Sequence, residues 1–261
     1  MHPAPVRHRV AIATATTSPV ASLFVDEQTD DAPRIIIPRP DIHLVIRLGP
    51  SAGGGLDAHA MGVRQAAYRK RVRGGQRTVI ARLRVGACEA VLGVPAAEIT
   101  GRMVALDDLW GATAARQLLD RLEDACDSDA AAGILAHALA ERAAMAKRPR
   151  VHLQQAVDAA ENMADANVRN LARDLGMSER HLRRVFRDAT GISPKTFARL
   201  RRFHRALDAA RPMRESGNHG TTWTTIAAAA GYYDQAHLIS DFRAIAGVTP
   251  SELLAELHQA I

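Results

Sequence analysis

Four arginines lie within eight residues of one another, at Arg180, Arg183, Arg184 and Arg187. On a helix at 100° per residue, the last three fall within about 60° of the first. Guanidinium groups donate paired, planar hydrogen bonds that fit phosphate oxygens and the two acceptors on the edge of guanine. Because like charges on one helix face repel one another, such a stripe is tolerated best where an anionic surface neutralises it. The stripe therefore favours a polyanionic partner, and a solvated surface face is the alternative.

The opposite side of this segment is apolar and faces away from the arginines. Its members are Leu182, Val185, Phe186 and Ala189. The preceding stretch, Leu171–Ser178, has the pattern of a short apolar helix, a glycine turn and a serine N-cap. A supporting helix, a tight turn and a two-faced second helix are what a helix-turn-helix needs to enter the major groove. The sequence thus predicts such a motif at about residues 168–190.

The same pattern returns about 56 residues later. Ala172, Gly176, Leu182, Phe186 and Pro194 reappear as Ala227, Gly231, Leu238, Phe242 and Pro250. Both copies close with a glycine, a hydroxyl residue and a proline, which end one helix and begin the next. This repeat argues against a merely solvated arginine face and predicts a second helix-turn-helix at about residues 222–246.

Cap residues mark the helices that must hold these motifs. Asn167 is expected to cap the first supporting helix, and Gly191 to end the helix that Ser178 begins. Ser193-Pro194 then starts a long helix over Lys195–Arg211, and the residues from Pro212 to Thr221 read as a loop.

Basic charge is concentrated in one part of the chain, although the whole carries a net charge of only +6 with a pI of about 10.0. Residues 1–146 hold 17 basic and 16 acidic side chains, residues 147–211 hold 15 and 7, and residues 212–261 hold 2 and 5. The middle segment therefore carries the attraction for a polyanion, while the last segment is acidic.

The N-terminal half follows different patterns. Residues 1–33 are expected to form a disordered tail, because prolines and an acidic patch interrupt them. Short β-branched runs follow, separated by glycine turns, and are expected to form antiparallel strands at Arg34–Ile37, His43–Leu48, Thr78–Val85 and Ala90–Val94. From Leu106 to Ala146 the apolar residues recur at helical spacing.

These patterns predict an α+β protein in two domains. A β-rich, barrel-like sensing or dimerisation domain ending in helices is expected over residues 34–146, and residues 147–150 are expected to be a linker. An all-α domain over residues 151–261 then carries the two helix-turn-helix motifs, joined by the long helix.

The sequence gives little support for a catalytic site or a metal site. Cys88 and Cys126 form no metal-binding pair and suggest a reducing, cytoplasmic setting without a structural disulfide. Gly53-Gly54-Gly55 lacks the Gly-Lys-Ser/Thr ending of a phosphate loop, and no apolar run is long enough to cross a membrane. We expect no enzyme activity, cofactor, metal or membrane partner.

The sequence over about residues 151–257 is similar to the AraC/XylS family of bacterial regulators. The matching stretches are Leu171–Gly191 with Ile192-Ser193-Pro194, then Ile226–Gln235, Phe242-Arg243 and Gly247–Pro250. The resemblance implies a transcription regulator, an activator in many members, whose two recognition helices enter successive segments of the major groove. Those contacts would lie about 34 Å apart on double-stranded promoter DNA.

Carried over by position, the family's base-reading sites correspond to Arg180, Arg183 and Arg184 in the first motif. Arg187, Lys195, Arg201 and Arg243 are the candidates for phosphate contacts. In the second motif the matching positions hold Ala236, Ile239 and Ser240, after Gln235. Arginine is absent there, so the sequence predicts that the first motif supplies most of the affinity and reads a G-rich segment.

The family's N-terminal domains commonly sense a small molecule or mediate dimerisation. Residues 91–96 and 106–111 resemble an uncharacterised regulator-associated domain that names no ligand. The resemblance leaves open a small-molecule effector, a homodimer and RNA polymerase as a partner, with the protein at the cytoplasmic nucleoid.

Two other classes of protein share part of this pattern. A DNA-alkylation repair protein can carry a similar domain, but it needs a cysteine cluster that two isolated cysteines cannot supply. The second class is an architectural protein that bends DNA without marked sequence choice. Such a protein would bind a particular site little more tightly than random DNA. The basic run Arg69–Arg73 is expected to be a solvated hairpin rather than a DNA contact.

Overall fold

The computed structural model describes residues 7–8, 18–28, 30–48, 56–146, 168–211, 213 and 222–259. The expected linker at 147–150, the Asn167 cap and the Gly53–Gly55 turn lie outside these residues, as does most of the expected loop from Pro212 to Thr221. None of the helices it describes is long and apolar enough to span a membrane.

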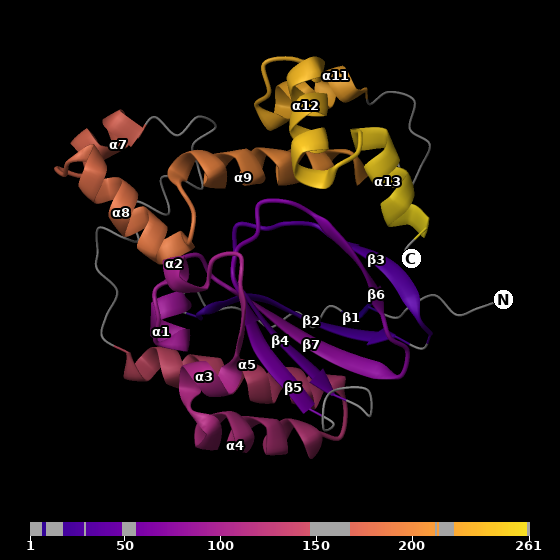
Figure 1. The fold of residues 1–261 in the computed structure, drawn as a ribbon, viewed down its shortest axis with the longest axis vertical. Helices are drawn as coiled ribbons and strands as arrows, with labels where there is room; N and C mark the ends of the chain where they lie inside the picture. Colours follow the sequence, from indigo (N-terminus) through magenta and orange to yellow (C-terminus); the bar gives the residue numbers. More distant parts are fainter. Residues whose placement is uncertain are drawn as a thin grey trace.

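The N-terminal part is built on antiparallel strands, which Figure 1 shows below the long helix of the C-terminal part. A six-stranded sheet has the order β1-β2-β7-β4-β5-β8, and β3 pairs with β6 in a separate ribbon. The strands are β1 (Arg7–His8), β2 (Val20–Gln28), β3 (Ala32–Ile36), β4 (His43–Leu48), β5 (Leu56–Met61), β6 (Tyr68–Val72), β7 (Gln76–Leu83) and β8 (Met103–Ala105). Among the described strands β1 and β8 remain the ends of the sheet, so the β-rich domain is an open sheet and not a closed barrel.

Strand β2 corrects the expectation of a disordered tail over residues 1–33. It lies between β1 and β7, and Leu23 and Val25 alternate into the core with no more than 1% of their surface exposed. The acidic residue Asp26 does not oppose this packing, because Arg34 forms an ion pair with it at 2.5 Å. Residues 18–28 are therefore part of the domain, and prolines and acids were a poor guide to order here.

The expected strand Ala90–Val94 is also wrong. The segment forms helix α1 (Cys88–Leu92), which ends where Gly93 turns left-handed at φ 81°. Val91 and Leu92 are fully buried in the helix, so tertiary packing outweighs the β preference of valine. The helical expectation for Leu106–Ala146 is confirmed by α3 (Leu106–Trp110), α4 (Ala112–Glu123) and α5 (Ser128–Met145), which follow α2 (Ala96–Ile99).

The described residues of the C-terminal part form helices joined by short turns, as expected. They are α7 (Val168–Asp174), α8 (Glu179–Thr190), α9 (Pro194–Ala209), α11 (Trp223–Ala230), α12 (Gln235–Ala246) and α13 (Pro250–Gln259). In Figure 1, α9 lies across the molecule, with α7 and α8 at one end and α11 and α12 near the other. The α+β class, with two helix-turn-helix motifs joined by a long helix, is confirmed.

The two parts are packed against each other at separated points. The Thr100 hydroxyl donates to the Gly191 carbonyl at 2.8 Å, and the Ala67 amide donates to the Ile245 carbonyl at 2.7 Å. Between these points the His204 imidazole, on α9, donates from Nε2 to the Pro38 carbonyl at 2.7 Å. The N-terminal part therefore contacts both motifs and the helix that joins them.

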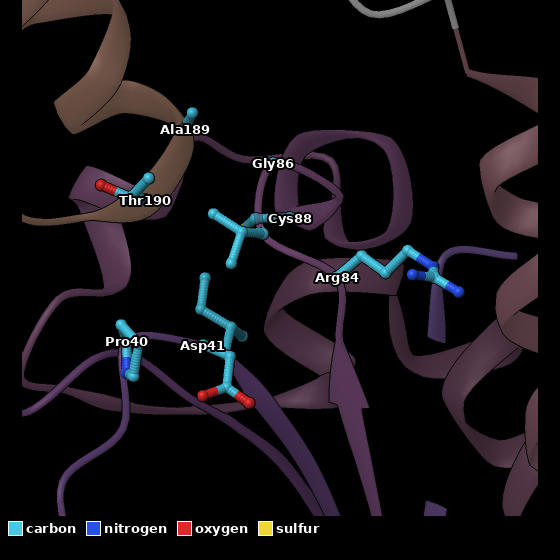
Figure 2. Close-up of a pocket in the computed structure, with 9 residues that line it drawn as sticks. Pro40, Asp41, Arg84, Gly86, Cys88, Ala189 and Thr190 are labelled. Atoms are coloured by element: carbon cyan, nitrogen blue, oxygen red, sulfur yellow. The ribbon is translucent and has the colours of Figure 1, made fainter. Parts of the chain in front are cut away.

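Figure 2 shows a small hollow at this junction, lined by Pro40 and Gly86 on one side and by Ala189 and Thr190 at the end of α8 on the other. Its internal volume of about 10 Å³ is roughly what one water molecule needs, and it is too small for a small-molecule ligand. The hollow is therefore a seam in the contact rather than an effector pocket.

Candidate nucleic-acid interface

The first motif is fixed by local backbone chemistry. Gly176 adopts φ 63° between α7 and α8, which lets the Met177 amide donate back to the Ala172 carbonyl at 2.9 Å. The Ser178 hydroxyl accepts from the His181 amide and so caps α8, as its position predicts. A left-handed Gly191 ends the helix. These caps fix both ends of α8 and hence the direction in which its side chains point.

The two faces of α8 are opposed as the helical count predicts. Leu182 and Phe186 are fully buried, and Phe186 packs edge-on against Phe197 of α9 with ring centres 5.4 Å apart. The four arginines of the stripe, Arg180, Arg183, Arg184 and Arg187, are all exposed. The apolar face anchors the helix, so the basic face is presented outward.

Neighbouring side chains hold part of this basic face in place. Glu179 accepts from Arg183 at 3.0 Å and from Arg169 of α7 at 3.2 Å. The Arg184 guanidinium lies 3.2 Å from Nδ1 of His181. Arg169 and His181 were not among the expected site residues, although their places at the start of α7 and one turn before Arg184 were a usable signal.

The second motif repeats the same construction. Thr222 and Thr225 form a capping box at the start of α11, and Asp234 accepts from the His237 amide at 2.7 Å to cap α12. Gly231 and Gly247 are left-handed, as Gly176 and Gly191 are in the first copy. The repeat seen in the sequence is therefore a repeat of structure, from α7–α9 to α11–α13.

Its outer face differs from that of the first motif. Ser240 is exposed, but Ile239 is half-buried and packs against the core, which limits its reach toward a base. Gln235 is also half-buried, and its Oε1 accepts from the Thr224 hydroxyl at 2.8 Å. Ala236 and His237 are exposed beside them. This face carries little positive charge.

The four expected phosphate-binding residues separate into two groups. Arg187, Lys195 and Arg243 are exposed on the two motifs and the start of α9. Arg201 is half-buried and lies close enough to Arg39 of the N-terminal part to contribute to lowering the pKa of that guanidinium, after burial and Arg82. Arg201 is thus turned toward the N-terminal part and is not brought together with the arginines of α8.

The model of a family described as a helix-turn-helix domain matches residues 171–256, from α7 into α13. The C-terminal part of this chain is an AraC-type helix-turn-helix domain. Domains of this type are those of DNA-binding transcription regulators. In a helix-turn-helix the second helix enters the major groove of DNA, and the arginine stripe lies on that helix, α8.

Several solved structures are similar to this chain or to part of it. An AraC-type regulator from Chromobacterium violaceum is 25% identical over 41% of this chain and 93% of its own, with a TM-score of 0.34. A transcriptional dual regulator from Escherichia coli K-12 is 24% identical over 41% of this chain and 98% of its own, at 0.32. ToxT from Vibrio cholerae O395 is 9% identical over 90% of this chain and 97% of its own, at 0.42. No match is found among the curated proteins.

Another residue of the AraC-type domain escaped sequence reasoning. Tyr233, in the turn before α12, exposes 93% of its surface, whereas its neighbour Tyr232 is buried. Its place directly before the Asp234 cap puts it at the end of the recognition helix that leads into a groove. The sequence alone does not show which of the two adjacent tyrosines faces outward.

The cysteines and the possible metal ligands are the described groups that bear on catalytic or metal chemistry. Domains of this kind belong to DNA-binding regulators rather than to enzymes. Burial raises the pKa of the Cys88 thiol to about 12, with help from Glu89 and Glu98, so this thiol is a poor nucleophile. Among the described residues no group of histidine, cysteine and carboxylate side chains is arranged to hold a metal ion.

Proposed function

We propose that this regulator binds a promoter operator mainly through α8, which reads a G-rich segment of the major groove. The observation that carries the proposal is the outward face of α8, where four exposed arginines are aligned by a capped helix with a buried opposite face. Arg180, Arg183 and Arg184 are assigned to base edges, where a paired arginine contact to guanine discriminates by roughly 1–3 kcal/mol.

Phosphate contacts come from Arg187 and Lys195 beside the first segment and from Arg243 beside the second. Each phosphate neutralised releases counterions, so affinity falls steeply with salt. Arg201 is left out of this set, because it is half-buried and close to Arg39 of the N-terminal part.

The second motif adds a weaker contribution. Ser240 and Gln235 offer hydrogen bonds and Ile239 offers an edge of apolar surface, but no arginine replaces those of the first copy. We assign to α12 a preference for shape and for an A·T-rich segment rather than most of the binding free energy.

The N-terminal domain is proposed to sense a small-molecule effector, with RNA polymerase and a second copy of the chain as further partners at the nucleoid. Its packing against Gly191, His204 and Ile245 supports this role, since a change in that domain reaches the DNA-binding helices directly.

The test is to capture fragments of the source genome with the purified full chain and sequence them. Expected is a recurring G-rich site, bound at least roughly a thousand times more tightly than random DNA in an anisotropy titration at fixed salt. Fragments without a shared sequence, bound with equal affinity, would instead indicate an architectural protein that bends DNA without sequence choice.

A further inference from the structure

Three arginines on successive turns of α9 are directed at the second motif. Arg199 donates from Nε to Oδ1 of Asp241 at 2.6 Å, and the Arg202 guanidinium lies 5.2 Å from the ring centre of Tyr232. Arg205 donates from Nη2 to the Ala230 carbonyl at 3.0 Å. The row thus touches the recognition helix, the turn and the end of the supporting helix.

Asp241 lies on the buried side of α12, only 7% exposed. Burial raises the pKa of the neighbouring Tyr232 hydroxyl, and the charge of Asp241 raises it further. Taking a carboxylate out of water is costly, and the attraction of one arginine roughly offsets that cost. An apolar pair of similar volume would give about equal or greater stability, so stability does not account for this ion pair.

The first motif provides an internal comparison. The residue that corresponds to Asp241, 56 positions earlier, is Val185, which is buried at 8% exposure on the inner face of α8. The helix-turn-helix fold is therefore satisfied by an apolar side chain at this place. A carboxylate at this position is found only in the second copy, where it binds Arg199 and so joins α12 to α9.

We propose that the Arg199–Asp241 ion pair is a positioning contact that fixes the angle of α12 relative to α8. Apolar packing, such as that of Phe203 against Phe242 at 4.5 Å between ring centres, attaches the second motif but tolerates rotation. A short hydrogen bond between charged groups is directional and therefore favours one orientation. The charge of Arg199 is neutralised within the protein, so this arginine takes no part in attracting DNA.

The first test measures orientation without DNA. Spin labels are placed on α7 and α12 in the full chain by Arg173→Cys and Ala244→Cys, both at exposed positions, with the exposed Cys126 changed to serine. The unaltered pair should give a narrow distance distribution by electron–electron double resonance. Arg199→Met with Asp241→Val, which gives the second motif the residue of the first, should broaden that distribution.

The matched control is Arg211→Ala, which removes an exposed ion pair with Asp208 on the same chain segment and should leave the distribution unchanged. Asp241→Asn, which keeps the side-chain volume, serves as a second variant if the double change fails to fold. A distribution as narrow in the folded variants as in the parent would overturn the proposal.

The second test rests on the proposed function and uses the captured site. Scrambling the segment under α12 should cost the wild type roughly tenfold in affinity and the double variant less than about threefold. Equal losses in both would refute positioning by this pair. The α8 contribution is measured separately by Arg184→Ala, so a failure of the proposed function is recognised on its own.

Discussion

Arg184 and Ser240 are exposed residues on the two recognition helices, and they separate the contributions of the two motifs. Arg184→Ala removes a guanidinium assigned to guanine and should cost about 1–3 kcal/mol of binding, a loss of roughly fivefold to 150-fold. Ser240→Ala removes one neutral hydroxyl and should cost less than about 1 kcal/mol. Fluorescence anisotropy on the captured operator makes the comparison. Similar losses for both variants would mean that the motifs share the affinity equally.

His204 makes the stability of the protein depend on pH. Burial lowers its pKa from 6.5 to about 4, and the positive charge of Arg39 lowers it further, partly opposed by the hydrogen bond to Pro38 and by Asp41 and Asp208. The unfolded chain therefore takes up a proton near pH 6.5, while the folded protein resists it until about pH 4. This stabilisation is complete above pH 6.5 and is lost as the pH falls toward 4, by at most about 3 kcal/mol.

His204→Gln is the matched variant, because its amide can still donate to Pro38 but does not titrate. Urea unfolding of both proteins at several pH values should show the wild type losing more stability than the variant between pH 7 and 4.5. Parallel curves would mean that the imidazole titrates normally in the folded protein.

At the scale of elements, Gly191 joins the end of α8 to the N-terminal domain. It is left-handed at φ 81°, and a Cβ there would lie 2.3 Å from the Thr100 hydroxyl and 3.1 Å from the Ala96 carbonyl. Gly176 is also left-handed, at φ 63°, but a Cβ there meets nothing within 4 Å. Both changes to alanine should cost about 1–2 kcal/mol of backbone strain, and Gly191→Ala should cost at least about 1 kcal/mol more.

Thermal unfolding of the two glycine variants checks this difference directly. Because backbone strain is common to both, the excess loss in Gly191→Ala reports the contact between α8 and α2. Equal melting temperatures would indicate that this contact is loose enough to move aside.

The sequence predicted the C-terminal elements well because their signals are local. Helical spacing and caps such as Ser178 and Gly191 act within a few residues. The internal repeat showed the same pattern a second time, which supported each assignment. The N-terminal strands depend on partners far along the chain, so β2 and the helix at Val91 were missed. For the site, the outward arginines followed from spacing alone. The half-burial of Ile239 and the inward turn of Arg201 follow from tertiary contacts that spacing does not contain.

At the scale of the molecule, the N-terminal domain holds each helix-turn-helix motif at its own place, besides the His204 contact on α9 between them. One is the hydrogen bond from Thr100 to Gly191 at the end of α8. The other is Arg69, which donates to both carboxylate oxygens of Glu256 on α13 at 2.7 Å and approaches the Ala246 carbonyl at the end of α12. The run Arg69–Arg73 was expected to be a solvated hairpin. Because Arg69 binds Glu256, this hairpin also docks the N-terminal domain against α13. Both motifs are thereby restrained by one domain.

Thr100→Val and Arg69→Ala should loosen the two motifs independently. Hydrogen exchange is expected to rise at the end of α8 in the first variant and over α12 and α13 in the second. Each global loss of stability should stay near or below about 1 kcal/mol, because one neutral hydrogen bond and one partly exposed ion pair contribute no more. Sites that share no partners add their effects, so the double variant should show the sum of both exchange patterns.

Arg71→Ala, on the same strand and well exposed, is the control for the second site and should leave α12 and α13 protected. Exchange that spreads from either single variant across both motifs would mean that the domain docks as one cooperative unit instead of at two separate points.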